Sequence, residues 1–344
     1  MIWPRVSIII LNWNSWRDTI ECLESVYHVT YENYDVVVVD NGSEDESIEN
    51  LRDYCEGNLR VGSARCEYSR DNKPITLTEY TEEQARDGKQ IGKLPLDVPS
   101  KSRLILIENQ TNYSFSEGTN IGITFALKAL GPDHVLLLNN DVIVDPDFLS
   151  RLVEVSESDA KIGIVGPRIH NYSHPNKLAF AGGRINLWLG QSHHVGLNET
   201  DQGKYSKVAE VDFIEGSCFL VKRKVVEDIG MFDSAYVAYW EDTDWCIRAN
   251  RAGYKVVYVP TAQIWHKESS TSAGPIKIYY YTKNRFLFMK KHASALQITS
   301  FMIAYLAIVI WYRICVLSLY HKSPRLLKPY FQAVKEGISI VCRK

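Results

Sequence analysis

Short, continuous runs of apolar residues recur along this chain of 344 residues, and most of them end in polar residues. Apolar side chains occupy nearly every position of a run, so the runs predict strands that are covered on both faces, as in a parallel sheet. The runs occupy residues 6–11, 36–39, 103–107, 135–138, 162–167, 211–221 and 256–260. Segments between them carry apolar residues at helical spacing. This alternation predicts an α/β fold with a mostly parallel sheet flanked by helices.

Two stretches depart from this alternation. Residues 60–103 are rich in charge and poor in apolar anchors. They predict a polar surface insertion, with a hairpin around residues 74–77 and no chemistry of its own. Residues 170–212 are rich in glycine, histidine and asparagine and predict a long loop region with short strands. The adjacent His193 and His194 lack the spacing of a ligand pair, so we expect them to be exposed loop residues.

Polar residues follow three of the predicted strands. Asn12 follows the first, Asp40 the second, and residues 139–141 (Asn-Asn-Asp) the strand at 135–138. Open α/β sheets bind ligands at the carboxyl ends of their strands. The Asp40 carboxylate can accept a hydrogen bond from the ring N–H of uracil or thymine, and an Asx turn is the alternative. A carboxylate with amide oxygens beside it, as at 139–141, can hold a hard divalent cation against phosphate; an ordinary turn is the alternative.

Residues 112–122 lie between a predicted strand and a predicted helix that runs to Leu130. Small residues before a helix let the backbone approach a ligand, and a helix N-terminus favours anions. The alternative is a tight connection in which glycine serves packing only. The stretch does not read G-x-G-x-x-G, so the dinucleotide-binding fingerprint is absent.

Carboxylates are concentrated near residue 242. Glu241, Asp242 and Asp244 open a predicted helix beside two tryptophans. Acids at a helix start complement the helix dipole, but crowded carboxylates near apolar rings also raise one another's pKa, which suits a general base. Upstream, residues 216–217 (Gly-Ser) lie within a predicted strand, where glycine marks a bulge or the close approach of another group. Downstream, His266 taken alone is more often a structural histidine than a ligand.

The C-terminal part has a different composition. Residues 293–312 carry no charge and are just long enough to cross a bilayer. Basic residues flank both ends, which favours a helix in the cytoplasmic membrane interface, or a re-entrant hairpin, over a simple crossing. A buried helix pair packed on the rest of the protein, or a contact in a homo-oligomer, is the alternative.

Charge and cysteine content narrow the class of protein. The formal net charge is -2, so no broad basic surface indicates a nucleic-acid partner. The 7 cysteines form no C-x-x-C pair, which indicates reduced thiols in a cytoplasmic protein and not a disulfide framework or zinc site. The chain begins without a charged-then-apolar leader, so we expect no secretory signal.

Five motifs, in their order and spacing, resemble those of inverting glycosyltransferases of family 2, which have a GT-A, Rossmann-like fold. The motifs are residues 40–43, 112–122, 139–141, 241–244 and His266. The resemblance is nearest to the rhamnosyltransferase-like branch, which builds surface polysaccharides and glycans. It implies a GT-A catalytic domain over residues 1–291, with the 60–103 insertion, and a C-terminal membrane-associated helical segment over 292–344.

The resemblance also implies a role for each motif. It assigns the nucleotide-sugar donor to Asn12, Asp40, Gly118, Asn120 and Asn140. It assigns Mg²⁺ or Mn²⁺ on the diphosphate to Asp141, His266 and Asn139. It assigns the catalytic base to Asp242, with Glu241 beside it, and the acceptor path to Gly216 and Ser217. Two residues depart from the family pattern: Asn139 replaces a carboxylate, which weakens the ionic hold on a metal, and Ser114 stands where many relatives have glycine.

The implied reaction moves a sugar from a nucleotide diphosphate sugar, dTDP-rhamnose-like or UDP-linked, to a lipid-linked or polysaccharide glycan acceptor. One carboxylate deprotonates the acceptor hydroxyl, and a divalent metal stabilises the leaving diphosphate. The expected location is the inner face of the cell membrane, with a peripheral or monotopic attachment. A non-catalytic nucleotide- or glycan-binding scaffold of the same fold is the alternative, and the intact residues Glu241, Asp242 and Asp141 favour the enzyme.

Overall fold

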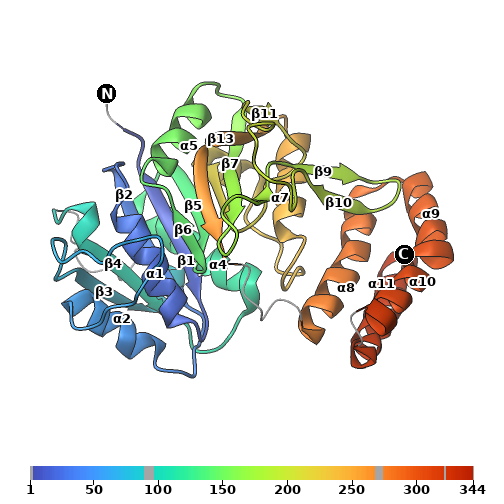
Figure 1. The fold of residues 1–344 in the computed structure, drawn as a ribbon, viewed down its shortest axis with the longest axis horizontal. Helices are drawn as coiled ribbons and strands as arrows, with labels where there is room; N and C mark the ends of the chain where they lie inside the picture. The colour runs from blue at the N-terminus through green and yellow to red at the C-terminus, as the bar shows by residue number, and fades with distance from the viewer. Residues whose placement is uncertain (1–2, 89–96, 268–273, 321–322, 344) are drawn as a thin grey trace.

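A computed structural model of the protein describes residues 3–88, 97–267, 274–320 and 323–343. Within these residues, one sheet of 11 strands runs through the centre of the molecule in the order β11-β13-β7-β12-β5-β1-β2-β4-β3 (Figure 1). Strand β6 pairs with β13 and β8 pairs with β7 beside this path, and β9 and β10 form a separate hairpin.

The strands and helices have the following bounds. The strands are β1 (Val6–Asn12), β2 (Tyr34–Asp40), β3 (Thr76–Thr81), β4 (Arg103–Glu108), β5 (His134–Asn139), β6 (Val142–Val144), β7 (Ile162–Asn171), β8 (Leu178–Phe180), β9 (Gly183–Asn186), β10 (Gln191–His194), β11 (Ala209–Glu210), β12 (Cys218–Lys222) and β13 (Lys255–His266). The α-helices are α1 (Trp16–Tyr27), α2 (Ser47–Glu56), α3 (Glu82–Asp87), α4 (Ser114–Phe125), α5 (Phe148–Glu157), α6 (Arg223–Ile229), α7 (Glu241–Arg251), α8 (Pro275–His292), α9 (Ala295–Ala304), α10 (Ile310–Cys315) and α11 (Leu327–Cys342).

The apolar runs became the central strands of the sheet. Strand β1 pairs in parallel with β2 and with β5, and β2 pairs in parallel with β4. Every residue of β2 is buried, as expected for a strand covered on both faces. Strand β12 interrupts the parallel order because it runs antiparallel to both β5 and β7. The predicted α/β fold with a mostly parallel sheet is therefore confirmed.

The prediction of a hairpin around residues 74–77 is wrong. Strand β3 pairs in parallel with β4, with Leu77 opposite Leu104, so this part of the insertion extends the sheet at its edge. Ile75 and Tyr80 are buried in the main core. An edge strand is covered less completely than a central one, so β3 lacks the continuous apolar run that marks the others.

The C-terminal helices stand beside the sheet, and the β9–β10 hairpin reaches toward them (Figure 1). Helix α8 packs against this group through an apolar cluster that contains Phe286, Met289, Phe301 and Tyr330. A continuous helical stretch, Ala295–Leu319, is long and apolar enough to cross a membrane, and only 11% of its most apolar window is buried. Most of this stretch is therefore not buried against the rest of the described chain, although Phe301 and Tyr305 pack on α8.

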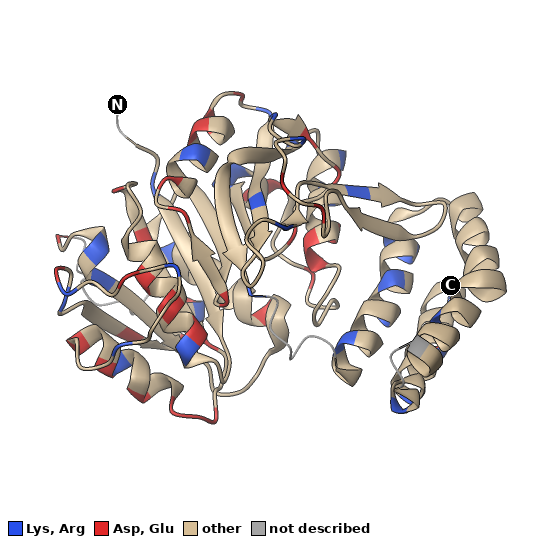
Figure 2. Ribbon diagram, in the orientation of Figure 1, with Lys and Arg blue, Asp and Glu red and all other residues tan. Residues whose placement is uncertain are grey.

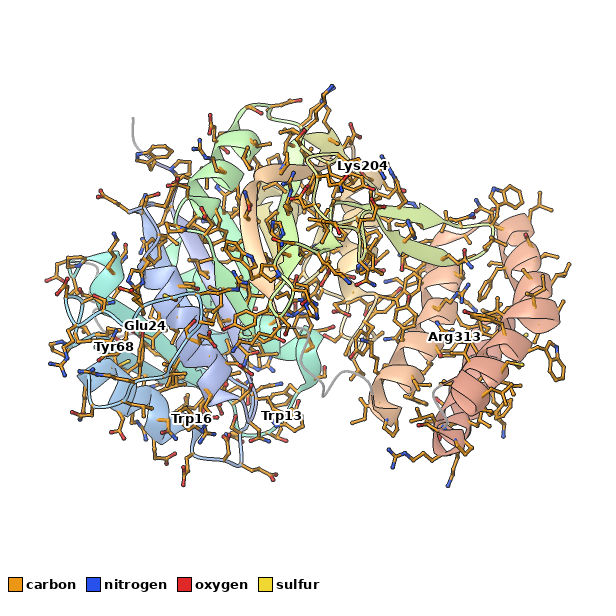
Figure 3. All side chains as sticks on the ribbon, viewed as in Figure 1. Trp13, Trp16, Glu24, Tyr68, Lys204 and Arg313 are labelled. Carbon is orange, nitrogen blue, oxygen red and sulfur yellow. The ribbon has the colours of Figure 1, made fainter. Side chains whose placement is uncertain are left out.

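Charge is sparse on the C-terminal stretch. Figure 2 shows that α9 and α10 are almost free of charged residues, in contrast to the helices around the sheet. Arg313 is the only charged residue between Ala295 and Leu319, and Figure 3 shows it among the C-terminal helices. The large apolar side chains that this stretch exposes are Leu296, Ile303, Leu306, Ile308, Trp311, Tyr312 and Leu319.

Candidate active site

The ends of β1 and β2 form one hydrogen-bonded cluster. Asn12 and Asp40 are opposite each other in the parallel register, and Asn12 Nδ2 donates to Asp40 Oδ1 over 2.7 Å. Ser43 donates its hydroxyl to Oδ1 and its backbone N–H to Oδ2 of Asp40, at 2.6 and 2.9 Å. The second of these bonds makes Asp40 a turn-forming residue, which was the alternative to base recognition. Contact with a nucleobase stays a prediction.

Thr19, on α1, connects this cluster to the end of β5. Its hydroxyl donates to Asn12 Oδ1 over 2.7 Å and accepts from Asn140 Nδ2 over 2.9 Å. Both Thr19 and Asn12 are fully buried. The side chains of Asn12, Asp40 and Asn140 therefore meet at the carboxyl ends of the neighbouring strands β1, β2 and β5. Thr19, which joins them, comes from α1.

Asp141 and His266 form the second part of the site. His266 ends β13, which pairs with β6 immediately after Asp141, and His266 Nε2 lies 3.1 Å from Asp141 Oδ1. The other ring nitrogen, Nδ1, lies 3.4 Å from Glu215 Oε1. Burial alone would lower the pKa of His266, but the two neighbouring carboxylates outweigh it and raise the pKa to about 10. His266 is thus held between two acids, and its structural and ligand-like interpretations are compatible.

Asn139 lies at the end of β5 beside the segment that precedes β12. Its backbone N–H donates to the carbonyl oxygen of Ser217 over 2.8 Å. Among the described residues, no group of three or more histidine, cysteine, aspartate or glutamate side chains is arranged to hold a metal ion. Asp141 and His266 are in contact at this end of the sheet, and the role of these two residues and of Asn139 in holding a cation stays a prediction.

Asp242 is held by the backbone at the start of α7. Its Oδ2 accepts from the N–H of Gly216 over 2.8 Å, and its Oδ1 accepts from the N–H and the hydroxyl of Thr243. Burial raises the pKa of Asp242, and these hydrogen bonds offset only part of that effect. A Cβ at position 216 would lie 3.3 Å from Asp242 Oδ2. The expectation that this glycine permits the close approach of another group is confirmed, although Gly216 and Ser217 precede β12 and do not lie inside it.

Glu241 adds a buried carboxyl group beside Asp242, which is half-buried. Its Oε2 atom is buried without a hydrogen-bond partner among the described residues. Burial, and then the charge of Asp242, raise the pKa of Glu241 well above its usual value. The crowding of carboxylates predicted for this helix start therefore contributes to the raised pKa of Glu241. The pKa of Asp242 is raised by burial and by the charge of Glu215, which lies outside the helix.

Asp244 behaves differently from its neighbours. Its carboxylate lies 2.5 Å from Lys291 Nζ, 2.7 Å from His292 Nε2 and 2.7 Å from Arg248 Nε. Burial alone would raise the pKa of Asp244, but these partners hold it well below its usual value. Asp244 therefore anchors the end of α8 to α7. Lys291 is one of the basic residues that flank the apolar segment in the sequence. In the structure its ammonium group is paired with Asp244.

A strained turn precedes the two carboxylates. Tyr239 and Trp240 have φ values of 67° and 78°, in the left-handed region that bulky residues avoid, at a cost of roughly 1–3 kcal/mol each. Asn284 on α8 donates to the carbonyl oxygens of Ala238 and Tyr239, and Trp240 Nε1 donates to the carbonyl oxygen of Tyr281. Helix α8 therefore stabilises the backbone conformation that delivers Asp242 to Gly216.

The expectation that residues up to 122 precede a helix is wrong. Helix α4 begins at Ser114, so Gly118 and Asn120 lie inside it. A Cβ on Gly118 would lie 2.9 Å from Asn41 Oδ1 and Leu11 Cδ1, which supports the packing alternative for this glycine. Asn120 uses both ends of its amide on the backbone of Phe232. Their contact with a donor stays a prediction.

Ser114 adopts the conformation that glycine adopts most easily. Its φ is 76°, in the left-handed region. Asn112 Oδ1 accepts from the N–H of Ser114 over 2.8 Å, and Asn41 Nδ2 donates to its carbonyl oxygen over 3.0 Å. The turn that glycine would make is therefore retained with serine, held by two asparagines.

Residues 215–217 join the two halves of the site. Glu215 contacts His266, which contacts Asp141, while Gly216 contacts Asp242 and Ser217 contacts the end of β5. Asp141 and Asp242 are 101 positions apart in the chain. Residues 215–217 nevertheless contact Asp242 directly and reach Asp141 through His266. Sequence reasoning missed Glu215 and Thr19 as site residues; a carboxylate immediately before the Gly-Ser pair was the available signal for the first, and Thr19 had none.

Known structures share this arrangement of strands and helices. A mannosyltransferase from Pyrobaculum calidifontis in complex with GDP-Man and Mn²⁺ has a TM-score of 0.57 at 14% identity, over 98% of this chain and 88% of that chain. A structure of S. aureus TarS, residues 1–349, has a TM-score of 0.54 at 12% identity, over 98% and 81% of the two chains. At this identity the likeness concerns the fold, which is the GT-A fold.

The sequence matches two family models. One, "Glycosyltransferase like family 2", covers residues 96–285, and the other, "Glycosyl transferase family 2", covers residues 7–72. The first alone spans more than half of the chain, so the protein belongs to glycosyltransferase family 2. The resemblance inferred from the five motifs is confirmed.

Curated relatives match over part of their length. The low-salt glycan biosynthesis hexosyltransferase Agl10 of Haloferax volcanii is 25% identical over 192 residues, 53% of this chain and 58% of that protein. The N-acetylglucosaminyl-diphospho-decaprenol L-rhamnosyltransferase of Mycobacterium tuberculosis is 29% identical over 171 residues, 46% of this chain and 55% of that protein. The matched region is thus less than two thirds of either relative.

Proposed function

We propose that the protein is an inverting glycosyltransferase that moves a sugar from a nucleotide diphosphate sugar to a glycan or lipid-linked acceptor. The observation that carries the proposal is the joining of Asp141 and His266 to Asp242 through residues 215–217. One half offers ligands for a cation beside a diphosphate, and the other offers a carboxylate with a raised pKa. Inverting transfer needs a base for the acceptor hydroxyl and a positive charge beside the leaving diphosphate. Asp242 would be the base, and a cation held by Asp141 and His266 would provide the positive charge.

Asp242 would act as the base. Inverting transfer is an in-line displacement in which the acceptor hydroxyl attacks the anomeric carbon and loses its proton. The Asp242 carboxylate is fixed by Gly216 and Thr243, so its orientation is set before the acceptor arrives. Its raised pKa improves its ability to accept a proton near neutral pH. Beside it, burial and the charge of Asp242 raise the pKa of Glu241 as well.

Asp141 and His266 fit a divalent cation. Oδ1 of Asp141 and Nε2 of His266 face each other over 3.1 Å, and Nδ1 of His266 faces a carboxylate, as in many metal-binding histidines. Mg²⁺ and Mn²⁺ accept few protein ligands when phosphate oxygens and water complete their coordination. The mannosyltransferase of similar fold was solved with Mn²⁺. When bound, the cation would stabilise the charge on the leaving diphosphate.

The donor and acceptor classes follow from the relatives. The mycobacterial relative is named for transfer of L-rhamnose to a decaprenol-linked sugar, and a dTDP-rhamnosyl transferase of Shigella flexneri also matches. We therefore propose a dTDP-rhamnose-like or UDP-linked donor, contacted by Asn12 and Asp40, and an acceptor that passes Gly216 and Ser217.

A turnover assay tests the proposal. The protein is incubated with dTDP-rhamnose or a UDP-sugar, a lipid-linked sugar acceptor and MnCl₂, and release of the nucleoside diphosphate is measured. Acceptor-dependent release, with inversion at the anomeric carbon, supports the proposal. Binding of a nucleotide sugar without any release, across all donors, would instead support the non-catalytic scaffold.

We also propose that the stretch Ala295–Leu319 lies in the membrane interface. It is apolar and largely exposed, and Arg313 interrupts it near one end. Trp311 and Tyr312 beside that arginine are exposed, and such aromatic residues favour the level of lipid headgroups. A membrane surface would cover the exposed apolar side chains and bring the site to a lipid-linked acceptor.

Replacing Ile303 and Ile308 by glutamate should release the protein from lipid vesicles. Both side chains are about two thirds exposed, at 64% and 67%. Each buried isoleucine contributes about 1.5–3 kcal/mol, so the pair should weaken partitioning by at least ~100-fold in vesicle sedimentation. Ile276→Glu, at an isoleucine that is 69% exposed on α8, is the matched control and should leave sedimentation unchanged. Equal sedimentation of all three proteins would contradict this location.

A further inference from the structure

Glu215 lies between two histidines, and each of its oxygen atoms faces one of them. Oε1 lies 3.4 Å from His266 Nδ1, and Oε2 lies 3.5 Å from His194 Nδ1. Glu215 is therefore a half-buried carboxylate that contacts two imidazole rings at once.

The His194 ring is itself fixed by packing. It meets Phe180 edge-on, with ring centroids 5.2 Å apart, and lies 5.6 Å from Phe213. It is half-buried at the end of β10, so the expectation that it is an exposed loop residue is wrong. His194 contacts Oε2 of Glu215, and this leaves Oε1 toward His266.

Orientation of His266 matters because its two nitrogens are distinct. A cation on Nε2 would take the place of the Nε2 proton, which leaves the Nε2 lone pair to the cation while Nδ1 keeps its own proton and donates a hydrogen bond to a carboxylate. Nε2 is the atom that faces Asp141. A ring turned the other way, or a ring without a partner for Nδ1, would present this lone pair poorly.

We propose that Glu215 is a positioning residue that holds His266 with Nε2 toward Asp141 and so preorganises the cation site of the donor diphosphate. The inference rests on the proposed function. Glu215 acts through His266 and touches neither donor nor acceptor. The same residue links the cation site to the β9–β10 hairpin through His194, and through Gly216 its backbone continues to Asp242.

The test measures Mn²⁺ binding directly, by electron paramagnetic resonance of free Mn²⁺, together with the Mn²⁺ dependence of turnover. Glu215→Ala should weaken Mn²⁺ binding by about 10–100-fold and leave kcat at saturating Mn²⁺ within about threefold. Glu215→Gln keeps an oxygen acceptor and should recover part of the affinity. Glu210→Gln, at an exposed glutamate on β11, is the control and should match the unmodified protein.

A double substitution separates positioning from an independent role. If Glu215 acts through His266, Glu215→Ala combined with His266→Ala should bind Mn²⁺ no more weakly than His266→Ala alone. Additive losses, or unchanged Mn²⁺ affinity in a folded Glu215→Ala variant, overturn the inference while the proposed function stands. If the unmodified protein neither binds Mn²⁺ nor turns over any donor, the proposed function fails, and the inference fails with it. Thermal melting of each variant identifies a loss of folding, and Glu215→Gln decides the matter if Glu215→Ala does not fold.

Discussion

Asp242→Asn should reduce turnover by about 10²–10⁴-fold, the usual contribution of a general base. The amide preserves the size of the side chain and one acceptor oxygen, but it cannot take a proton from the acceptor hydroxyl. Donor binding should survive, because Asp242 belongs to the acceptor side of the site. The measurement is kcat with saturating donor and acceptor, together with the dissociation constant of the nucleotide sugar.

The pH dependence of turnover in the unmodified enzyme should also depend on Asp242. The base works only when it is deprotonated, so turnover should fall as pH drops through the pKa of Asp242. Burial raises that pKa, so the fall should begin at a higher pH than for an exposed aspartate. Asp228→Asn, on the surface of α6, is the control. Near-normal turnover in Asp242→Asn, with the acid limb intact, would remove Asp242 from the role.

Asp141→Ala should have the second-largest effect. The carboxylate would hold the cation on the diphosphate, and loss of a Lewis acid that is worth several kcal/mol should lower kcat/KM for the donor by roughly 10²–10³-fold. The substitution also removes the partner of His266 Nε2. Turnover is measured over a range of Mn²⁺ concentrations and with a chelator, with Asp147→Ala, at an exposed neighbouring aspartate, as the control. Equal activity with and without the chelator, in both the unmodified and the variant protein, would contradict a metal at Asp141.

The sheet could be predicted because each central strand is a continuous apolar run in the sequence. Residues 36–39 and 135–138 are apolar at every position, and both lie in central parallel strands that are buried on both faces. Strand β3 was not predicted, because an edge strand needs apolar residues at only some positions and its partner β4 begins 22 residues after it ends. Helix α4 begins earlier than expected because its glycines permit close packing against β1 and β2 and do not mark the helix start.

The sequence alone determined the class of fold, the family and the order of the motifs, because apolar periodicity and motif spacing are properties of neighbouring residues. The tertiary structure decided which groups meet. Pairing of β6 with β13 brings His266 to Asp141, and the approach of α7 to Gly216 brings Asp242 to the same segment. Glu215 acquires its two histidines only there, since His194 and His266 come from separate hairpin and sheet strands. Such contacts join residues distant in the chain, and no local pattern records them.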